Sequence, residues 1–348
     1  MPRRLEAIDL FCGVGGLTHG LERAGIDVRL GVDLDPACEF PYKANNRAEF
    51  LLESVGNLTA DKLKSHLTKR SPLLLAGCAP CQPFSLYRQG KTDETDSRWN
   101  LLKSFQKLVG SLEPTFVTME NVPRLAEQSV FAAFVRYLRK REYHVWCKVV
   151  DCVRYSVPQH RERLVLLASK LGSIELLEPK TWRYRTVRQV IAKMPRLAVG
   201  RAHPQDAIHQ SSGMSPTNLK RIKASVPGGS WKDWPSDLVA DCHKKSSGKS
   251  YPSVYGRMNW DEPSPTLTTQ FFGFGNGRFG HPEQDRAISL REGALLQSFP
   301  KSYRFVQRGE RVHIGRVGRL IGNAVPVKLA EAIGRSIIEH AEEHRVIK

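Results

Sequence analysis

The stretch LEAIDLFCGVGGLTHGLERAG, residues 5–25, carries the pattern that decides the fold. An apolar run of strand length leads into a turn with three glycines, and the helical pattern that follows closes at Gly25. Such a turn lets backbone amides approach a ligand and aims a helix N-terminus at it. Asp33 lies roughly twenty residues further on, where an acidic side chain can bind two ribose hydroxyls. The pattern fits an adenosine-containing cofactor, but a purely structural glycine turn fits it equally well.

The alternation of strand-like and helical segments continues to about Leu171. Further strand-like runs cover residues 27–35, 71–78, 115–122, 144–152 and 162–170. Strands that alternate with helices predict an α/β fold with a doubly wound, mainly parallel sheet. From there to about Pro263 no period dominates, and turn formers, tryptophans and basic residues crowd together. We therefore predict an α/β domain over residues 1–172, completed by residues 300–348, and a smaller, irregular domain over residues 173–299.

The charge of the chain points to its partners. Its 348 residues include 53 basic and 35 acidic side chains, a formal net charge of +18. This excess favours a polyanionic partner such as nucleic acid, because lysine and arginine on a phosphate backbone release counterions. No apolar stretch has the length of a membrane span or of a signal peptide, so we expect no membrane partner. Seven irregularly spaced cysteines do not suggest a disulfide framework, which favours a reducing compartment.

Cys78 and Cys81 end a strand-like run, with two residues between them. They could form a redox pair, half of a zinc site, or one nucleophile beside a bystander. Zinc needs a second ligand pair at suitable spacing, and Cys147 with Cys152 is a poor one, so we predict no metal. A redox pair would favour a shorter, thioredoxin-like chain. In the third interpretation Cys78 is a buried thiol, and Cys81, stiffened by the prolines that flank it, is an exposed nucleophile.

Charged residues stand at the ends of two further strands. Glu120 closes the strand in TFVTMENV, so it should emerge at the same sheet edge as Cys81, where a carboxyl can bond or protonate a base ring nitrogen. Arg161 and Arg163 in QHRERL alternate into a core strand, where an unpaired charge is expensive.

Taken in order, these motifs resemble those of the bacterial-type cytosine-C5 DNA methyltransferases, which depend on S-adenosylmethionine. DLFCGVGG (9–16) resembles the cofactor loop, GCAPCQPFS (77–85) the proline-cysteine motif, ENV (120–122) the glutamate motif and QHRERL (159–164) the paired-arginine motif. EPSPTLTT (262–269) resembles the element that borders the recognition domain, and IGNAVPVKLAEAIG (321–334) the closing motif. The resemblance implies a Rossmann-like class I methyltransferase domain and a target-recognition domain, the latter in the stretch of roughly residues 172–258 that the motifs leave uncovered.

The resemblance implies a catalytic role for four residues. Cys81 would add to C6 of cytosine, so that C5 can attack the methyl group of the cofactor. Glu120 would hold the base through N3 and its amino group. Arg163 would bond the base O2, and Arg161 would support the site. The target base would have to leave the duplex to reach such a thiol.

The resemblance also implies the residues that hold S-adenosylmethionine: Phe11, Gly13, Gly15, Gly16, Asp33, Leu34, Asn57, Pro80, Asn323 and Val325. Phe11 would stack on the adenine, and Asp33 would take the ribose hydroxyls. Four positions depart from the family pattern. Cys12 and Cys78 are small thiols where a residue such as alanine and an aromatic, respectively, are common. Asn57 replaces an aspartate that accepts from the adenine amino group, which an amide oxygen can still do, and Leu34 replaces a more usual aromatic.

Basic side chains in two stretches are the candidate DNA contacts. The loop of residues 86–99 suits a mobile lid over DNA, and the segment 184–260 carries much of the basic and aromatic excess. The candidates are Ser85, Arg88, Lys91, Arg98, Lys220, Arg221, Lys244, Lys245 and Arg257. The stretch FFGFGNGRFG, residues 271–280, is expected to be a flexible loop that either follows the DNA groove or simply turns.

We therefore predict a site-specific DNA cytosine-5 methyltransferase that uses S-adenosylmethionine and acts on double-stranded DNA. The alternatives are an RNA (tRNA) cytosine-5 methyltransferase, a catalytically silent DNA-binding homologue and a CxxC oxidoreductase. The sizeable basic domain argues against tRNA, and the intact set of Cys81, Glu120, Arg163 and Asn323 argues against lost catalysis. We expect a monomer in the bacterial cytoplasm, associated with the nucleoid, with a cognate restriction endonuclease as a possible partner.

Overall fold

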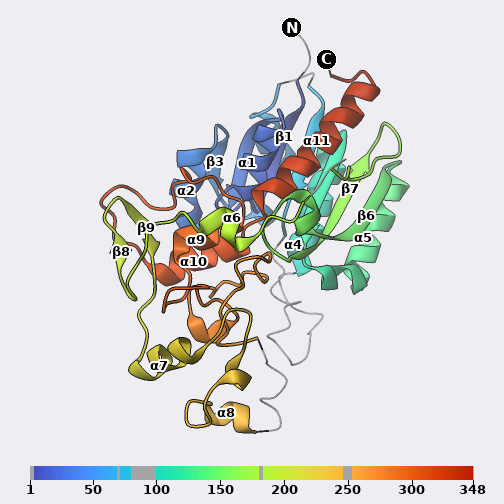
Figure 1. The fold of residues 1–348 in the computed structure, drawn as a ribbon. Helices are drawn as coiled ribbons and strands as arrows, with labels where there is room; N and C mark the ends of the chain where they lie inside the picture. The colour runs from blue at the N-terminus through green and yellow to red at the C-terminus, as the bar shows by residue number, and fades with distance from the viewer. Residues whose placement is uncertain (1–3, 69–70, 80–98, 180–182, 246–252, 348) are drawn as a thin grey trace. The chain divides into compact units, whose positions relative to one another are not determined.

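Figure 1 shows the computed structural model of the chain, in which the structure describes residues 4–68, 71–79, 99–179, 183–245 and 253–347. The chain divides into two compact units. The first unit comprises Met1–Tyr155, Glu162–Thr181 and Val325–Lys348, and the second comprises Ser156–Arg161 and Trp182–Ala324. Residues 300–324, which we expected to complete the α/β domain, lie in the second unit, where helix α10 (Ile314–Asn323) contacts helix α9 (Leu290–Leu296).

The first unit is built on a seven-stranded sheet with the order β3-β2-β1-β4-β5-β7-β6. Its strands are β1 (Glu6–Leu10), β2 (Asp27–Asp33), β3 (Glu49–Leu52), β4 (Leu73–Gly77), β5 (Phe116–Asn121), β6 (His144–Asp151) and β7 (Glu162–Ser169). Neighbours from β3 to β5 pair in parallel, and β7 runs antiparallel to both β5 and β6. The prediction of a doubly wound, mainly parallel α/β sheet is confirmed.

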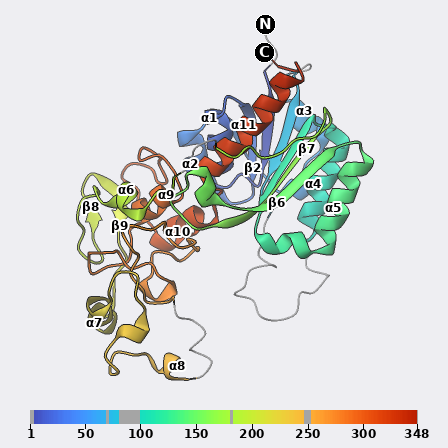
Figure 2. The same cartoon turned by 45° about the vertical axis from the view of Figure 1, so that its right-hand side comes forward.

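Helices cover both faces of this sheet, as Figures 1 and 2 show. They are α1 (Gly16–Arg23), α2 (Glu39–Asn45), α3 (Ala60–Lys64), α4 (Trp99–Leu112), α5 (Ser129–Lys140) and α11 (Val327–Glu343), with short 3-10 turns at Pro36–Cys38, Val55–Asn57, Pro123–Glu127 and Cys152–Tyr155. Because both faces are covered, the central strands are buried along nearly their whole length, and all five residues of β1 are buried, Glu6 and Asp9 included. Phe105 of α4 and Phe134 of α5 pack into the core on one face, with ring centroids 5.6 Å apart.

Helix α1 packs against α11, which comes from the other end of the chain. Small residues allow the close approach. A Cβ at Gly20 would lie 2.3 Å from the Cβ of Ala330, and a Cβ at Gly334 would lie 2.6 Å from that of Ala24. Arg23 reinforces the contact through Glu331, with 3.2 Å between Nε and Oε2. The C-terminal segment is therefore an integral part of the first unit.

The second unit has little regular structure, as its sequence predicted. Its elements are α6 (Val187–Ile191), β8 (Ala202–His203), β9 (Asp206–Gln210), α7 (Pro216–Ala224), α8 (Asp241–Lys244), α9 and α10, with 3-10 turns at Trp231–Asp233 and Phe274–Asn276. A small core forms around Ile222, Trp231, Trp234 and Phe274. Arg286 and Glu292, both fully buried, form a bidentate pair with N–O distances of 2.7 and 2.8 Å.

Candidate active site

Glu120 lies near the end of β5, at the carboxyl edge of the parallel strands, as the sequence predicted. Its side chain is buried, with 3% of its surface exposed. The thiol of Cys78, just after β4, donates to Glu120 Oε2 at 3.1 Å. Arg163 Nε lies 2.9 Å from Oε1 in an ion pair, and among the described residues Oε1 has no aligned hydrogen-bond donor. The carboxylate is thus held in place while one oxygen keeps acceptor capacity.

Asn121, which follows Glu120, ties β5 to the segment after β4. Its Nδ2 donates to the carbonyl of Ala79 at 2.8 Å, and its Oδ1 accepts from the amide of Val122 at 2.9 Å. Ala79, the last described residue of this segment, is therefore held in place by Asn121. No role for Asn121 was predicted from the sequence, and Cys78 was interpreted as a buried thiol beside the nucleophile. Both lie at the carboxyl ends of neighbouring parallel strands, which was the signal that could have found them.

The two arginines of the QHRERL motif belong to different units. Arg163 has a mostly buried side chain on β7, where it also donates through Nη1 to the carbonyl of Glu162 at 2.6 Å. Arg161 is 3% exposed in the second unit, and it donates to the carbonyls of Leu267 and Gly322, at 3.0 Å each. Arg161 therefore braces the backbone of its own unit, whereas Arg163 pairs with Glu120.

The glycine turn after β1 has the backbone shape of a ligand-binding loop. Gly13 and Gly15 have φ angles of 53° and 87°, and Phe11 also has a positive φ, 59°. A non-glycine residue in that region costs about 1–3 kcal/mol, and such strain concentrates at functional sites. Gly15 precedes Gly16, the first residue of α1, so the turn opens directly into a helix N-terminus.

Asp33, at the end of β2, holds this turn. Its Oδ2 accepts from the amide of Gly13 at 2.8 Å, and its Oδ1 accepts from the amide of Asp35 at 2.9 Å. Burial raises the pKa of Asp33, although these two amide bonds act in the opposite direction. Each carboxylate oxygen can accept a second hydrogen bond, so the geometry still suits a pair of ribose hydroxyls.

Exposed apolar side chains lie beside Asp33 at the same edge. Leu34 is 68% exposed and Leu52, whose backbone pairs with Asp33 across β2 and β3, is 46% exposed. Phe11 is partly buried against the core below, and Asn57 is exposed in its 3-10 turn. An apolar surface next to polar acceptors is the chemistry that an adenosine would need, so these residues fit such a group.

A fully buried carboxylate, Asp9, lies near the end of β1 just before the glycine turn. Its Oδ2 accepts from the hydroxyl of Thr18 at 2.7 Å. Thr18 Oγ1 also lies 2.9 Å from the hydroxyl of Tyr42, whose ring packs against the bare Cα of Gly31. Burial raises the pKa of Asp9 to about 7, against the hydrogen bonds from Thr18. This group links β1, α1 and α2 next to the candidate cofactor loop.

Several predicted residues lie outside the described residues, namely Pro80, Cys81, Ser85, Arg88, Lys91 and Arg98. Two others fall at the junction of the units. Asn323 is exposed as the last residue of α10 in the second unit, and Val325 is buried as the first residue of the last segment of the first unit.

The predicted DNA contacts of the second unit fall into two groups. Lys220, Lys244 and Lys245 are exposed. Arg257 is only 5% exposed, and its three guanidinium nitrogens donate to the carbonyls of Ile222, Ser225, His281 and Gln284 and to Asp285. The structure therefore gives Arg257 a structural role in place of the expected DNA contact, because its donors are used within the unit.

Arg221 is also engaged within the second unit. It donates to the carbonyl of Leu238 at 2.8 Å, and its guanidinium lies over the rings of Trp234 and Tyr255. The glycine-aromatic stretch 271–280 likewise differs from a flexible loop, because Phe271, Phe274 and Phe279 are at most 3% exposed. Glycines gave the stretch the look of a free loop, but its aromatic side chains anchor it in the core.

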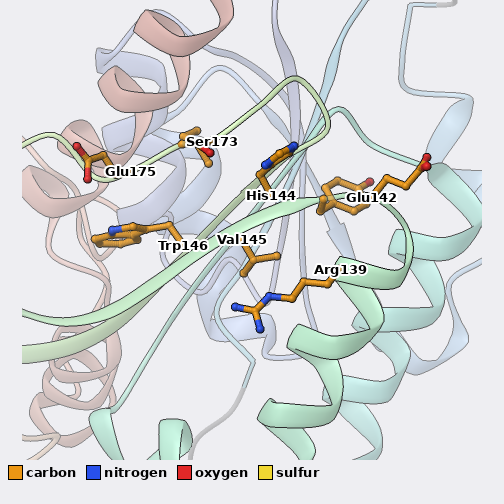
Figure 3. A pocket seen from close by; sticks show the side chains of 9 residues that line it. Arg139, Glu142, His144, Val145, Trp146, Ser173 and Glu175 are labelled. Carbon is orange, nitrogen blue, oxygen red and sulfur yellow. The ribbon is translucent and has the colours of Figure 1, made fainter.

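A separate hollow of about 790 Å³ lies at the edge strand β6. Figure 3 shows Arg139 of α5 at one side and Trp146 with Glu175 at the other. The full lining is Arg139, Glu142, Tyr143, His144, Val145, Trp146, Ser173, Ile174 and Glu175. None of the sequence motifs contributes to it. Within the described part of the chain, no helix is both long and apolar enough to cross a membrane.

Comparison with known proteins identifies the family. A profile of the C-5 cytosine-specific DNA methylases matches residues 5–339. The chain is 49% identical over 335 residues to the Type II methylase M.HgiDII of Herpetosiphon aurantiacus, an alignment that covers 95% of this chain and 94% of the relative. It is 32% identical to the Type II methyltransferase M1.HphI of Haemophilus parahaemolyticus, across 96% of this chain and 87% of the relative.

Solved structures agree on the fold. A prophage-encoded DNA modification methyltransferase of E. coli superposes with a TM-score of 0.74 at 24% identity, covering 96% of this chain and 99% of that one. DNMT2 of Spodoptera frugiperda gives a TM-score of 0.65 at 17% identity, with the same coverage. The first unit thus has the class I methyltransferase fold. The chain belongs to the C-5 cytosine-specific DNA methylase family and is a DNA cytosine-5 methyltransferase.

Proposed function

We propose that this chain transfers the methyl group of S-adenosylmethionine to C5 of a flipped-out cytosine in double-stranded DNA, through a covalent bond between Cys81 and C6. The observation that carries this proposal is the buried carboxylate of Glu120. It is fixed by Cys78 and Arg163, and none of the described residues offers its Oε1 an aligned donor. Cys78 and Ala79, which contact Glu120 and Asn121, precede Cys81 by two or three positions in the sequence.

The proposed reaction uses these residues in turn. The Cys81 thiolate adds to C6, and the electron pair released from the C5–C6 double bond is accommodated by the ring as Glu120 shares a proton with N3. Arg163 offsets the charge that develops on the base through its O2, and Arg161 keeps the neighbouring backbone in place. C5 then takes up the methyl group, a base removes the C5 proton, and expulsion of Cys81 restores the double bond. Glu120 recovers its proton from N3.

S-adenosylmethionine would supply an electrophilic methyl group on a sulfonium centre. Asp33 would bind the ribose hydroxyls, while Phe11, Leu34 and Asn57 would surround the adenine. The glycine turn would let the methionine end approach the N-terminus of α1, with Pro80, Asn323 and Val325 completing the pocket. The strained φ of Phe11 and the acceptor capacity left on Asp33 support this assignment.

We further propose that the second unit reads a short double-stranded site, with Lys220, Lys244 and Lys245 on phosphates and with Ser85, Arg88, Lys91 and Arg98 closing from the first unit. The net charge of +18 supports a polyanionic substrate. The 49% identity to a Type II methylase supports a place in a restriction–modification system with a cognate endonuclease. We propose that the enzyme acts as a monomer in the bacterial cytoplasm.

The test uses a mechanism-based trap. DNA with 5-fluorocytosine at the target should become covalently linked to the protein in the presence of S-adenosylmethionine. Fluorine replaces the C5 proton, and because a base cannot remove it, the adduct cannot break down. Cys81→Ser should form no linked species, whereas Cys78→Ser, the matched control, should still form it. Labelled cofactor with unmethylated genomic DNA should yield 5-methylcytosine. Label in RNA alone, or a linked species with Cys81→Ser, would overturn the proposal.

A further inference from the structure

The last turn of α11 brings three ligand-type side chains together at the end of the sheet opposite to Glu120. His340, Glu343 and His344 have the spacing that places side chains on one face of a helix. One nitrogen from each histidine and one carboxylate oxygen of Glu343 all lie within 4.8 Å of one another. No other group of this kind occurs among the described residues of the chain. The cluster was not predicted from the sequence, although its His-x-x-Glu-His spacing is visible there.

Each histidine already has one ring nitrogen held by the protein. His340 Nε2 lies 2.9 Å from the hydroxyl of Ser169, which in turn accepts from the amide of Leu171 at 3.0 Å. His344 Nδ1 lies 2.9 Å from the carbonyl oxygen of His340. Histidines that bind metals commonly donate one ring N–H to such a partner, which fixes the ring and leaves the other nitrogen for the ion.

The surroundings suit an ion with one open side. His340 is 6% exposed and sits edge-on to the ring of Phe116, while Glu343 and His344 are exposed. A Cβ at position 172 would come within 3.1 Å of His344 Nε2, so the glycine there leaves this nitrogen accessible. Water can complete the coordination on the open side. Ser169 pairs with Phe116 at the start of β5, which places the cluster at the amino edge of the parallel strands.

We propose that His340, Glu343 and His344 form a binding site for a divalent transition-metal ion of the zinc class, with water as the remaining ligand. Two imidazoles and one carboxylate suit zinc, cobalt or nickel, whereas magnesium and calcium prefer oxygen ligands alone. All three ligands come from one helical turn that is anchored through Ser169 on β7. The ion would hold the last turn of α11 in its helical form, while the hydrogen bond between His340 and Ser169 joins that turn to β7. The ion would take no part in methyl transfer.

The experiment titrates Co²⁺ into the full-length, tag-free, metal-stripped protein and records the visible spectrum. Cobalt distinguishes this site from the cysteines, because thiolate ligands give a strong charge-transfer band in the near ultraviolet. We expect one ion per chain with a nitrogen–oxygen spectrum and no thiolate band. His344→Ala should weaken binding at least about tenfold, and Glu343→Gln should weaken it less. Glu342→Ala, an exposed neighbour on the same turn, is the matched control and should bind as the parent does.

Thermal unfolding gives a second measurement. Because a ligand that binds only the folded state stabilises it, Co²⁺ or Zn²⁺ should raise the Tm of the parent and of Glu342→Ala, but not that of His344→Ala. The methylation rate of His344→Ala should equal that of the parent, with or without metal. Equal cobalt affinity in the parent and His344→Ala, or a spectrum dominated by thiolate, would overturn the proposal even if methylation itself is confirmed.

Discussion

Two buried carboxylate–guanidinium pairs, one in each unit, differ in how completely they are satisfied. In the second unit, both oxygens of Glu292 meet Arg286, and Oε2 also accepts from the amide of Ser289 at 2.7 Å. Burial would raise the pKa of Glu292, but Arg286 holds it below its usual value. In the first unit, Glu120 meets Arg163 through a single nitrogen, and its Oε1 has no aligned donor in the part of the chain that the structure describes.

The difference separates structural from chemical use of the same residue types. In a saturated pair, the hydrogen-bonding groups are already used within the protein. The contribution of Arg286 and Glu292 is therefore to hold α9 to the chain before it. An unsaturated pair at the open end of a strand keeps a costly buried acceptor for a partner that arrives later. Asp9 is a third case, a buried carboxylate that accepts from the hydroxyl of Thr18, and burial raises its pKa in spite of that hydrogen bond.

The largest effect is expected at the unsaturated pair. Glu120→Gln keeps the shape of the side chain but removes the proton exchange with N3, so the rate of methyl transfer should fall about 10²- to 10⁴-fold. The measurement is label transfer to DNA under single-turnover conditions, with exposed Glu127→Gln as the control. A Glu120→Gln enzyme within a few-fold of the parent rate would remove the distinction drawn between the two pairs.

Breaking the saturated pair of Arg286 and Glu292 should lower the stability of the protein. Arg286→Met leaves Glu292 buried and uncompensated, which should cost about 3–5 kcal/mol of unfolding free energy. The double variant Arg286→Met/Glu292→Gln removes both charges and should recover part of this loss. Urea unfolding would measure the free energy of unfolding of the single and the double variant. If Arg286→Met lowered activity without lowering stability, the pair would not be structural.

Asp9, beside which the described residues place no cation, should make the stability of the protein depend on pH. The unfolded chain releases the Asp9 proton near the ordinary value of 3.8, whereas the folded chain keeps it up to about 7. The free energy of unfolding should therefore fall as pH rises from about 4 to about 7. In a series of Tm measurements across this window, Asp9→Asn should lack that fall of several degrees, while exposed Asp237→Asn should retain it. Parallel curves for the parent and Asp9→Asn would contradict the raised pKa.

The smallest effect is expected at Cys78. Cys78→Ala removes the thiol donor to Glu120 and should slow methyl transfer about threefold to tenfold, in keeping with the loss of one hydrogen bond. Cys78→Ser keeps a donor and should remain close to the parent rate, so the two variants separate a positioning role from mere filling of space. Equal rates for Ala and Ser would show that the hydrogen bond has no part in orienting Glu120.

Much of the first unit could be predicted from the sequence because its signals are local. The apolar run and glycines of DLFCGVGG predicted the strand, turn and helix, and the end of TFVTMENV placed Glu120 at the carboxyl edge. The reversed strand β7 was not predicted, since an apolar strand carries no mark of its direction. The contacts of Cys78 and Asn121 also depend on which strands become neighbours, which only the folded sheet decides.

The second unit shows the opposite limit. Arg221 and Arg257 look like phosphate-binding residues in a basic, irregular segment, but carbonyls and aromatic rings distant in the sequence take up their charge. Exposed Lys220, Lys244 and Lys245 stay predictions as DNA contacts. Charge alone does not tell an arginine that organises a loop-rich core from one that faces the solvent.

The packing of α1 against α11 has a consequence for biosynthesis. Arg23 and Glu331 are 308 positions apart, so the first helix emerges from the ribosome long before the helix that covers it exists. At about 5–20 residues per second, the wait is on the order of 15–60 s, during which the whole second unit is made. In a circular permutant whose original N- and C-termini are joined and whose new termini lie elsewhere, α11 and α1 would be close in sequence. This would shorten the delay, and the nascent chain would need less protection by chaperones.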